Sequence, residues 1–208
     1  MYVVIRKTGL VGFLEKVAER ARDHIVPLIQ GRAGFHGYCT FITEQGDIAY
    51  SVSIFDEREA AIDADQRVQQ WIGANMSDLM QDESELVAGE TVFHEVSHPQ
   101  EQQKSRQRSL FVIIRSYTGL TGQTETMHSL VSEHTLPAIK QAKGFRGFYA
   151  FRDEADPNRA ISVTLFDTRE EAMHTHEAVV AIMRDQLGAM AYGTPRVVLG
   201  ETVVLATG

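Results

Sequence analysis

The chain repeats itself at an offset of about 110 residues, and this duplication restricts its fold more than any other feature. Short stretches recur in the same order in both halves. The matching pairs are Val3-Val4-Ile5-Arg6 with Val112-Ile113-Ile114-Arg115, Gly34-Phe35-His36-Gly37 with Gly144-Phe145-Arg146-Gly147, Ser51–Asp56 with Ser162–Asp167, and Gly89-Glu90-Thr91-Val92 with Gly200-Glu201-Thr202-Val203. A period this long indicates a duplicated domain, because solenoid repeats are only 20–50 residues long.

The duplication predicts two domains, at 1–96 and 110–208. Residues 97–109 separate them and are polar and rich in glutamine, without apolar periodicity. Such a segment is typical of a linker.

Each copy contains the same succession of elements. Short β-branched and aromatic runs predict four strands per copy, and Ala-rich stretches predict the second helix. The expected strands are 2–6, 35–42, 48–55 and 87–95 in the first copy and 110–115, 145–152, 159–166 and 197–206 in the second, with helices over 60–73 and 171–187. With a first helix between the first two strands, the order is β-α-β-β-α-β, the ferredoxin-like unit.

The first helix of each copy has an apolar stripe at α-helical spacing. The stripe includes one histidine in each copy, and the proline three residues after that histidine, Pro27 or Pro137, is expected to kink or end the helix. Its members are Val17, Ala21, His24 and Leu28 in the first copy and Met127, Val131, His134 and Ala138 in the second. We therefore expect both histidines to point inward.

The first strand of each copy is apolar at consecutive positions, as in Val3-Val4-Ile5. A continuous apolar run predicts a sheet covered on both faces. The helices of this unit cover one face, so we expect a second sheet, from the other copy, to cover the other.

An acidic pair follows the third strand in each copy. Asp56 and Glu59, and likewise Asp167 and Glu170, have the spacing of a capping box. We expect these carboxylates to cap the second helix rather than to act in catalysis.

Composition excludes several classes of function. The net charge is −8 and the pI about 5.5, without a basic stripe, so neither nucleic acid nor an anionic membrane surface is an expected partner. Cys39 is the only cysteine, which excludes an internal disulfide. The N-terminus does not have the pattern of a secretory signal, and no apolar stretch approaches the roughly 20 residues of a membrane span. The expected location is the cytoplasm.

The Gly-Phe-x-Gly strand entries and the Phe-Asp-x-Arg-Glu-x-Ala exits of the third strands resemble the antibiotic-biosynthesis-monooxygenase-like domain. That family belongs to the dimeric α/β-barrel superfamily. The resemblance covers nearly all of both copies. It implies an α+β fold in which two ferredoxin-like βαββαβ units, with antiparallel sheets, pack as an intramolecular pseudo-dimeric α/β barrel. It also implies a pocket between sheet and helices in each half.

The resemblance implies activity on a small aromatic or quinol-like ligand, since family members oxygenate such compounds without a cofactor. A haem-degrading branch uses an Asn on the first strand and a Trp–His pair on the last long helix. Here the first strands carry Arg6 and Arg115, Trp71 is followed by Gln81 where the His is expected, and Ile182 replaces the Trp in the second copy. Haem degradation is therefore not expected, and no cofactor is predicted.

Six residues are candidates for the site. His24 and His134 are the expected bases, although a core histidine bonded to a backbone carbonyl is the alternative reading. Arg6 and Arg115 are candidates to hold an anionic substrate, or else they end their strands in solvent. Tyr38 and Trp71 are expected either to contact the ligand or to pack in the core; Tyr38 and Tyr149 lie one register apart, so at most one of them lines an equivalent pocket.

The histidines and Cys39 show no metal-binding spacing and no nucleophile motif. Two functions remain open: a cofactor-independent monooxygenase, and a binding or assembly protein on the same scaffold. The sequence specifies no substrate and leaves self-association beyond the internal pair open.

Overall fold

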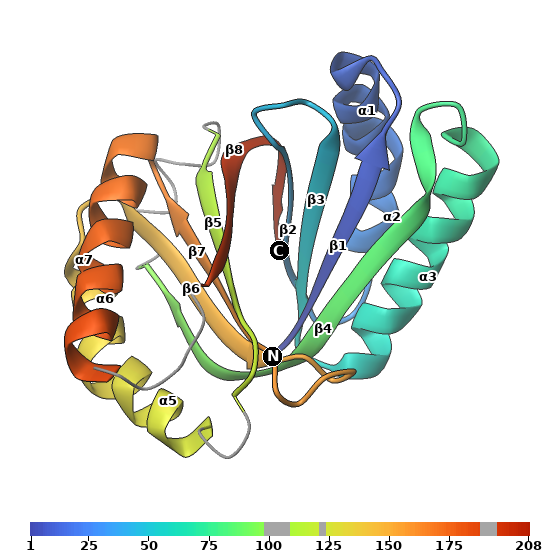
Figure 1. Cartoon of the computed structure of the whole chain (residues 1–208). Coiled ribbons are helices and arrows are strands. Elements are labelled where there is room, and N and C mark those ends of the chain that lie inside the picture. Colours follow the sequence, from blue (N-terminus) through green and yellow to red (C-terminus); the bar gives the residue numbers. More distant parts are fainter. Residues whose placement is uncertain (98–108, 121–123, 188–194) are drawn as a thin grey trace. The chain divides into compact units, whose positions relative to one another are not determined.

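The computed structural model describes residues 1–97, 109–120, 124–187 and 195–208, and it confirms the β-α-β-β-α-β order twice (Figure 1). The predicted linker, 97–109, lies almost entirely outside the described residues. The first copy comprises β1 (Tyr2–Leu10), α1 (Leu14–Arg20), η1 (Ala21–Ile25), α2 (Val26–Gln30), β2 (Phe35–Ile42), β3 (Ile48–Phe55), α3 (Arg58–Asn75) and β4 (Met80–Val96). The second comprises β5 (Phe111–Tyr117), α5 (Thr124–Leu130), η2 (Val131–Thr135), α6 (Leu136–Gln141), β6 (Phe145–Arg152), β7 (Ala160–Phe166), α7 (Arg169–Leu187) and β8 (Arg196–Thr207).

The chain divides into two compact units, and the last strand of each copy contributes to both. Unit 1 contains residues 1–91 and 200–208, and unit 2 contains 92–199. Hydrogen bonding joins the eight strands in the closed order β1-β3-β2-β8-β5-β7-β6-β4, an antiparallel barrel. The α+β class is confirmed, and the packing of the copies as an intramolecular pseudo-dimer stays a prediction.

The pairing register is the same in both copies. Tyr2 lies opposite Phe55 in unit 1, and Phe111 lies opposite Phe166 in unit 2. Both sheets also have an irregularity where the Gly-Phe-x-Gly strands β2 and β6 begin. The glycine before each of these strands, Gly34 or Gly144, has a positive φ of 72° or 70°, a conformation that a residue with a Cβ rarely adopts.

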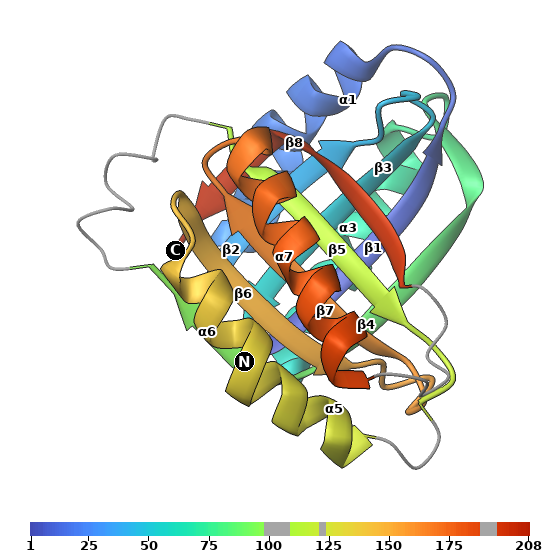
Figure 2. The same ribbon diagram turned by 60° about the vertical axis from the view of Figure 1, so that its left-hand side comes forward.

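The first strand of each copy is buried on consecutive positions, as its apolar run predicted. In β1, Tyr2 and Val4 belong to the unit 1 core, and Val3 and Ile5, which point the other way, are buried as well. Helices α1, α2 and α3 cover one face of the unit 1 strands (Figure 1), and α5, α6 and α7 cover β5–β7 in unit 2 (Figure 2). The alternation puts the fifth residue of each first strand, Arg6 or Arg115, on the helix side.

The first helix of each copy contains one π-helical turn, η1 or η2, which overturns the predicted apolar face. The buried stripe of the first copy runs through Val17, Ala21, Ile25 and Ile29, with a spacing of four residues throughout. A π turn adds a residue to the helical repeat and rotates the later turns of the helix about its axis. Consequently His24 and His134 are exposed, and the prediction that they point inward is wrong.

The predicted capping boxes are also wrong. In α3 the N-cap residue is Glu57, and no side chain caps the helix. Asp56 instead accepts a hydrogen bond from His36 Nε2 (2.6 Å), and Asp167 forms an ion pair with Arg146. These carboxylates tie the end of the third strand to the second strand, and capping of α7 falls to Thr168, one residue later. Its Oγ1 accepts from the Glu171 N–H at 3.3 Å and donates to the Glu171 carboxylate at 3.0 Å.

Two glycines near the end of the first helix give a matched test of backbone strain. Gly34 has a φ of +72°, and an added Cβ would lie 3.0 Å from the Cβ of Asp56, whereas Gly31 has a φ of −79° and open space around it. We expect Gly34→Ala to lower the free energy of unfolding by roughly 1–2 kcal/mol. Gly31→Ala should leave it unchanged or raise it by up to about 1 kcal/mol. Urea denaturation of both variants measures this, and equal effects would contradict the assignment of strain to Gly34.

Candidate functional site

Each unit contains a cavity of about 50 Å³ between its helices and its strands. This volume exceeds what a single water molecule needs. Both cavities lie against the π-helical turn of the first helix, through Ala21 and Ile25 in unit 1 and through Val131 and Thr135 in unit 2. The predicted position of a pocket in each half, between sheet and helices, therefore agrees with the structure.

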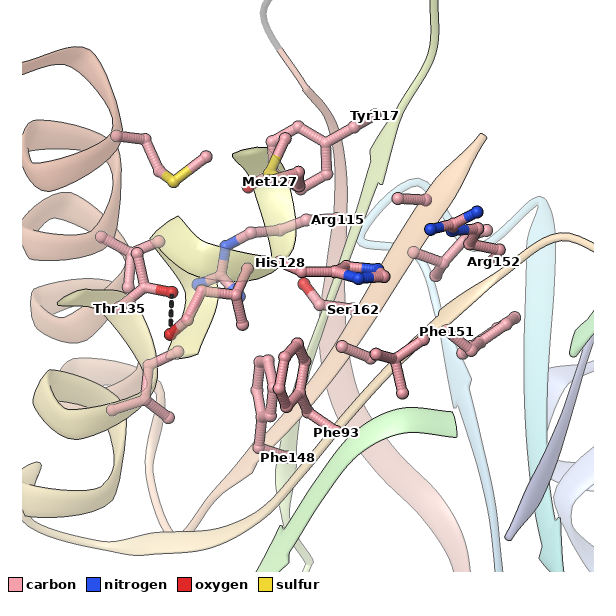
Figure 3. Close-up of a pocket in the computed structure, with 18 residues that line it drawn as sticks. Phe93, Arg115, Tyr117, Met127, His128, Thr135, Phe148, Phe151, Arg152 and Ser162 are labelled. Carbon is pink, nitrogen blue, oxygen red and sulfur yellow. Dashed lines mark hydrogen bonds between the residues drawn. The ribbon is translucent and has the colours of Figure 1, made fainter. Parts of the chain in front are cut away.

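Arg115 is the central polar group of the unit 2 cavity. The alternation of β5 brings it to the helix side, where only 1% of the residue is exposed. Its Nε donates to His176 Nδ1 at 3.1 Å and its Nη1 donates to Thr164 Oγ1 at 3.0 Å. Nη2 is buried and has no hydrogen-bond partner among the described residues. Figure 3 shows the guanidinium in the middle of the residues that line the cavity.

Because Arg115 is buried, the alternative that it ends its strand in solvent is wrong. That it holds an anion stays a prediction. Burial lowers the pKa of Arg115, with the nearby Tyr117 opposing that shift, but a guanidinium stays protonated in proteins. Unit 2 therefore holds a permanent positive charge beside its cavity. That charge has no carboxylate partner among the described residues.

The equivalent arginine of unit 1 has such a partner. Arg6 binds Asp65 of α3 with both branches of its guanidinium, Nε to Oδ1 at 2.9 Å and Nη2 to Oδ2 at 2.5 Å. Its Nη1 donates to Ser84 Oγ at 2.8 Å. The Arg6 and Asp65 side chains are 13% and 10% exposed, so the pair is largely desolvated. The unit 1 cavity thus contains an ion pair of zero net charge.

The difference between the units comes from one helix position. Asp65 is the eighth residue of α3, and His176 is the eighth residue of α7. His176 accepts a hydrogen bond from Arg115 Nε at Nδ1, so the imidazole is neutral with its proton on Nε2. Burial, and then the charge of Arg115, lower the pKa of His176, which keeps the ring neutral near pH 7. An acid in one copy is therefore replaced by a neutral acceptor in the other.

Three further side chains distinguish the unit 2 cavity. His128 of α5 is half-buried at its wall, edge-on to Phe93 with ring centroids 5.8 Å apart, where the first copy has Ala18. Arg152, at the end of β6, has a buried Nε without a hydrogen-bond partner among the described residues, where the first copy has Ile42. Tyr117, whose pKa burial raises, stands where the first copy has Thr8.

The unit 1 cavity is lined by hydroxyl groups as well as by the ion pair. Tyr38 lies on it and accepts a hydrogen bond from Thr40 Oγ1 at 2.8 Å. Burial raises the pKa of Tyr38 to about 12, so the phenol stays protonated. In unit 2, Phe148 takes the place of Tyr38 on the cavity, and Tyr149 is not among the lining residues. The register argument, which allowed at most one of Tyr38 and Tyr149 to line an equivalent pocket, agrees with this.

The other predicted site residues line neither of these two cavities. His24 stacks on Trp71 with ring centroids 5.0 Å apart and an interplanar angle of 26°, and Trp71 packs against the unit 1 core. His134 is exposed on the turn η2. A catalytic role for the two histidines and a ligand contact for Trp71 stay predictions, without support from the geometry.

The sequence-based reasoning missed His128, Arg152 and His176. The signal was available in the alignment of the copies, where Ala18, Ile42 and Asp65 are the corresponding residues. None of these exchanges forms a motif, since each lies on a different element. Among the described residues there is also no group of three His, Cys, Asp or Glu side chains placed to hold a metal ion, and no helix long and apolar enough to cross a membrane.

The single thiol should be unreactive in the native protein. Cys39 is 4% exposed, and burial raises its pKa to about 12, so almost no thiolate is present at neutral pH. We expect a disulfide reagent such as Ellman's to label Cys39 only after unfolding in guanidinium chloride. Rapid labelling of folded protein at pH 8 would show that β2 opens locally.

No protein-family model and no curated protein matches the sequence. Solved structures do. A candidate monooxygenase of Fusobacterium nucleatum subsp. nucleatum has a TM-score of 0.80 and 9% identity, over 99% of this chain and 94% of that one. A candidate monooxygenase of Lactobacillus acidophilus has a TM-score of 0.73 and 10% identity, over 99% and 96%. An anthrone oxidase-like protein has a TM-score of 0.60 and 11% identity, over 99% and 93%. At these identities the similarity concerns the fold alone: the chain shares the α+β barrel fold of these structures.

Proposed function

We propose that the chain is a cofactor-independent monooxygenase of the antibiotic-biosynthesis type that acts on a small aromatic, quinol-like substrate in the unit 2 cavity. One observation carries the proposal: an imidazole, His128, and a buried guanidinium without an acidic partner, Arg115, line the same cavity. The unit 1 cavity has neither. The names of the similar structures, two candidate monooxygenases and an anthrone oxidase-like protein, support the same reaction class.

The proposed chemistry needs a base, a charge that stabilises an oxyanion, and a dry site. His128 takes the proton of the substrate phenol, and Arg115 stabilises the phenolate. Most other lining side chains are apolar, among them Phe93, Phe148 and Val179, and they keep water away from the reacting carbon.

The ionised ring then donates electrons to O₂, and a carbon–oxygen bond forms. For a substrate with a methylene group beside the ring, the O–O bond breaks and one oxygen remains as a carbonyl. The two hydrogens lost from that carbon leave with the second oxygen as water. Dioxygen is thus the oxidant, and the substrate supplies all the electrons.

Oxygen uptake by protein freed of metal and flavin, measured against a panel of hydroquinones and anthrones, tests the proposal. We expect uptake with at least one substrate and a fall of at least about 100-fold in His128→Ala, because a general base contributes roughly 10²–10⁴-fold. The matched control is the double variant His24→Ala/His134→Ala, whose exposed rings line neither of the two cavities, and it should keep full activity.

Loss of uptake in the double variant with retention in His128→Ala would return the role of base to His24 and His134. No uptake by the unaltered protein across the panel would reject the oxygenase. A second function, a small-molecule-binding protein that uses Arg115 without chemistry, would then be favoured, because a buried cation in an apolar cavity is sufficient for binding.

A further inference from the structure

We infer that unit 2, and not unit 1, binds a small aromatic anion, and that the neutral residue His176 is what leaves Arg115 free to hold the anionic oxygen. The inference concerns the substrate class and rests on the proposed function only in placing the ligand in the same cavity. It is tested by binding rather than by turnover.

The buried charge of Arg115 is not balanced by an acidic side chain among the described residues. A buried charge without a counterion is costly, and removal of one partner from a buried ion pair strongly destabilises a protein. Arg115 is 1% exposed, and its neighbours His176 and Thr164 are neutral. Its Nη2 hydrogens have no acceptor in the part of the chain that the structure describes. An anionic oxygen on the ligand would satisfy these donors and balance the charge.

Arg6 of unit 1 can be compared directly with Arg115 of unit 2. Unit 1 has the same arginine at the same strand position, and there Asp65 occupies the guanidinium with two short hydrogen bonds. A ligand anion at Arg6 would compete with a carboxylate that is already in place. The exchange of Asp65 for His176 removes this competitor from unit 2 while it keeps a hydrogen bond to Nε.

The other charged side chain on the unit 2 cavity is also positive. The side chains that line the unit 2 cavity include two arginines and no carboxylate. The second, Arg152, also has a buried nitrogen without a partner among the described residues, and the corresponding Ile42 of unit 1 is apolar. The potential in this cavity is therefore positive, which favours an anion over a neutral ligand of the same shape.

The aromatic side chains of the lining indicate what kind of body the anionic ligand has. Phe93, Phe148 and Phe151 belong to the cavity wall, and Figure 3 shows Phe93 and Phe148 together on one side of Arg115. Aromatic walls favour a flat aromatic body through stacked or edge contacts. A single ring with one anionic oxygen, carried by a carboxylate or by an acidic phenol, fits this combination.

Calorimetric titration with three probes tests the inference. Benzoate and 4-nitrophenolate represent the two sources of the anion, and benzamide is the neutral match of benzoate. We expect at least one of the anions to bind with one site per chain, and benzamide to bind at least about tenfold more weakly than benzoate where benzoate is that anion, since a hydrogen bond to a charged group contributes roughly 1.5–3 kcal/mol. Benzamide binding as tightly as the better anion, or two equal sites per chain, would overturn the inference.

A pair of variants at one position isolates the charge from the packing. His176→Asp recreates the pairing that Arg6 has with Asp65 and should weaken anion binding at least about tenfold, with Arg115 still present. His176→Asn keeps a neutral acceptor of similar size to Asp and should bind the anion at least about tenfold more tightly than His176→Asp does. Thermal unfolding of both variants controls for misfolding, and equal anion binding by the two folded variants would overturn the inference.

The inference and the proposed function fail separately. Anion binding that depends on residue 176, without oxygen uptake on any substrate, would reject the oxygenase and leave the anion site standing. Oxygen uptake that is equal for neutral and anionic substrates and unchanged in His176→Asp would reject the anion site and leave the oxygenase standing.

Discussion

The chemistry of each unit depends on the hydrogen bonds made by the arginine side chain that is buried on its first strand. Strand alternation puts Arg6 and Arg115 on the helix side, where each lines a cavity, and an arginine cannot lose its proton there. The structure must therefore provide an acceptor from the facing helix. Asp65 provides a charged one in unit 1 and His176 a neutral one in unit 2. As a result, Arg6 belongs to a neutral ion pair in the unit 1 cavity, whereas Arg115 has no carboxylate partner among the described residues of unit 2.

Duplication makes this difference tolerable. An unneutralised buried cation lowers stability, and such costs persist where function requires them. In this chain the cost is confined to one copy, because unit 1 keeps the paired arginine and a core in which Tyr38 and Thr40 satisfy each other. Unit 2 meets part of the cost with Thr164, whose neutral hydroxyl oxygen accepts a hydrogen bond from Arg115 Nη1.

The strands and their order were predictable because each contains a short run of β-branched and aromatic residues, and the repeat supplied every pattern twice. The face of the first helix was not predictable, because the α-helical period assigns His24 where the π turn assigns Ile25. A π turn has no sequence signature of its own. The capping prediction was wrong for a similar reason. Asp56 accepts a hydrogen bond from His36 of the paired strand β2 and does not cap the helix.

The site was less predictable than the fold because its residues are those that differ between the two copies, and they form no sequence motif. His128, Arg152 and His176 lie on a first helix, a second strand and a second helix, and each is ordinary in its own segment. Only the fold brings His128 and Arg152 to one cavity and places His176 against Arg115, which lines it. Since the copies share their scaffold, positions that support folding tend to agree between them, while positions that differ and converge on a cavity have no structural reason to differ together. Aligning the copies and then mapping the mismatches onto the fold therefore identifies candidate site residues, which neither step does alone.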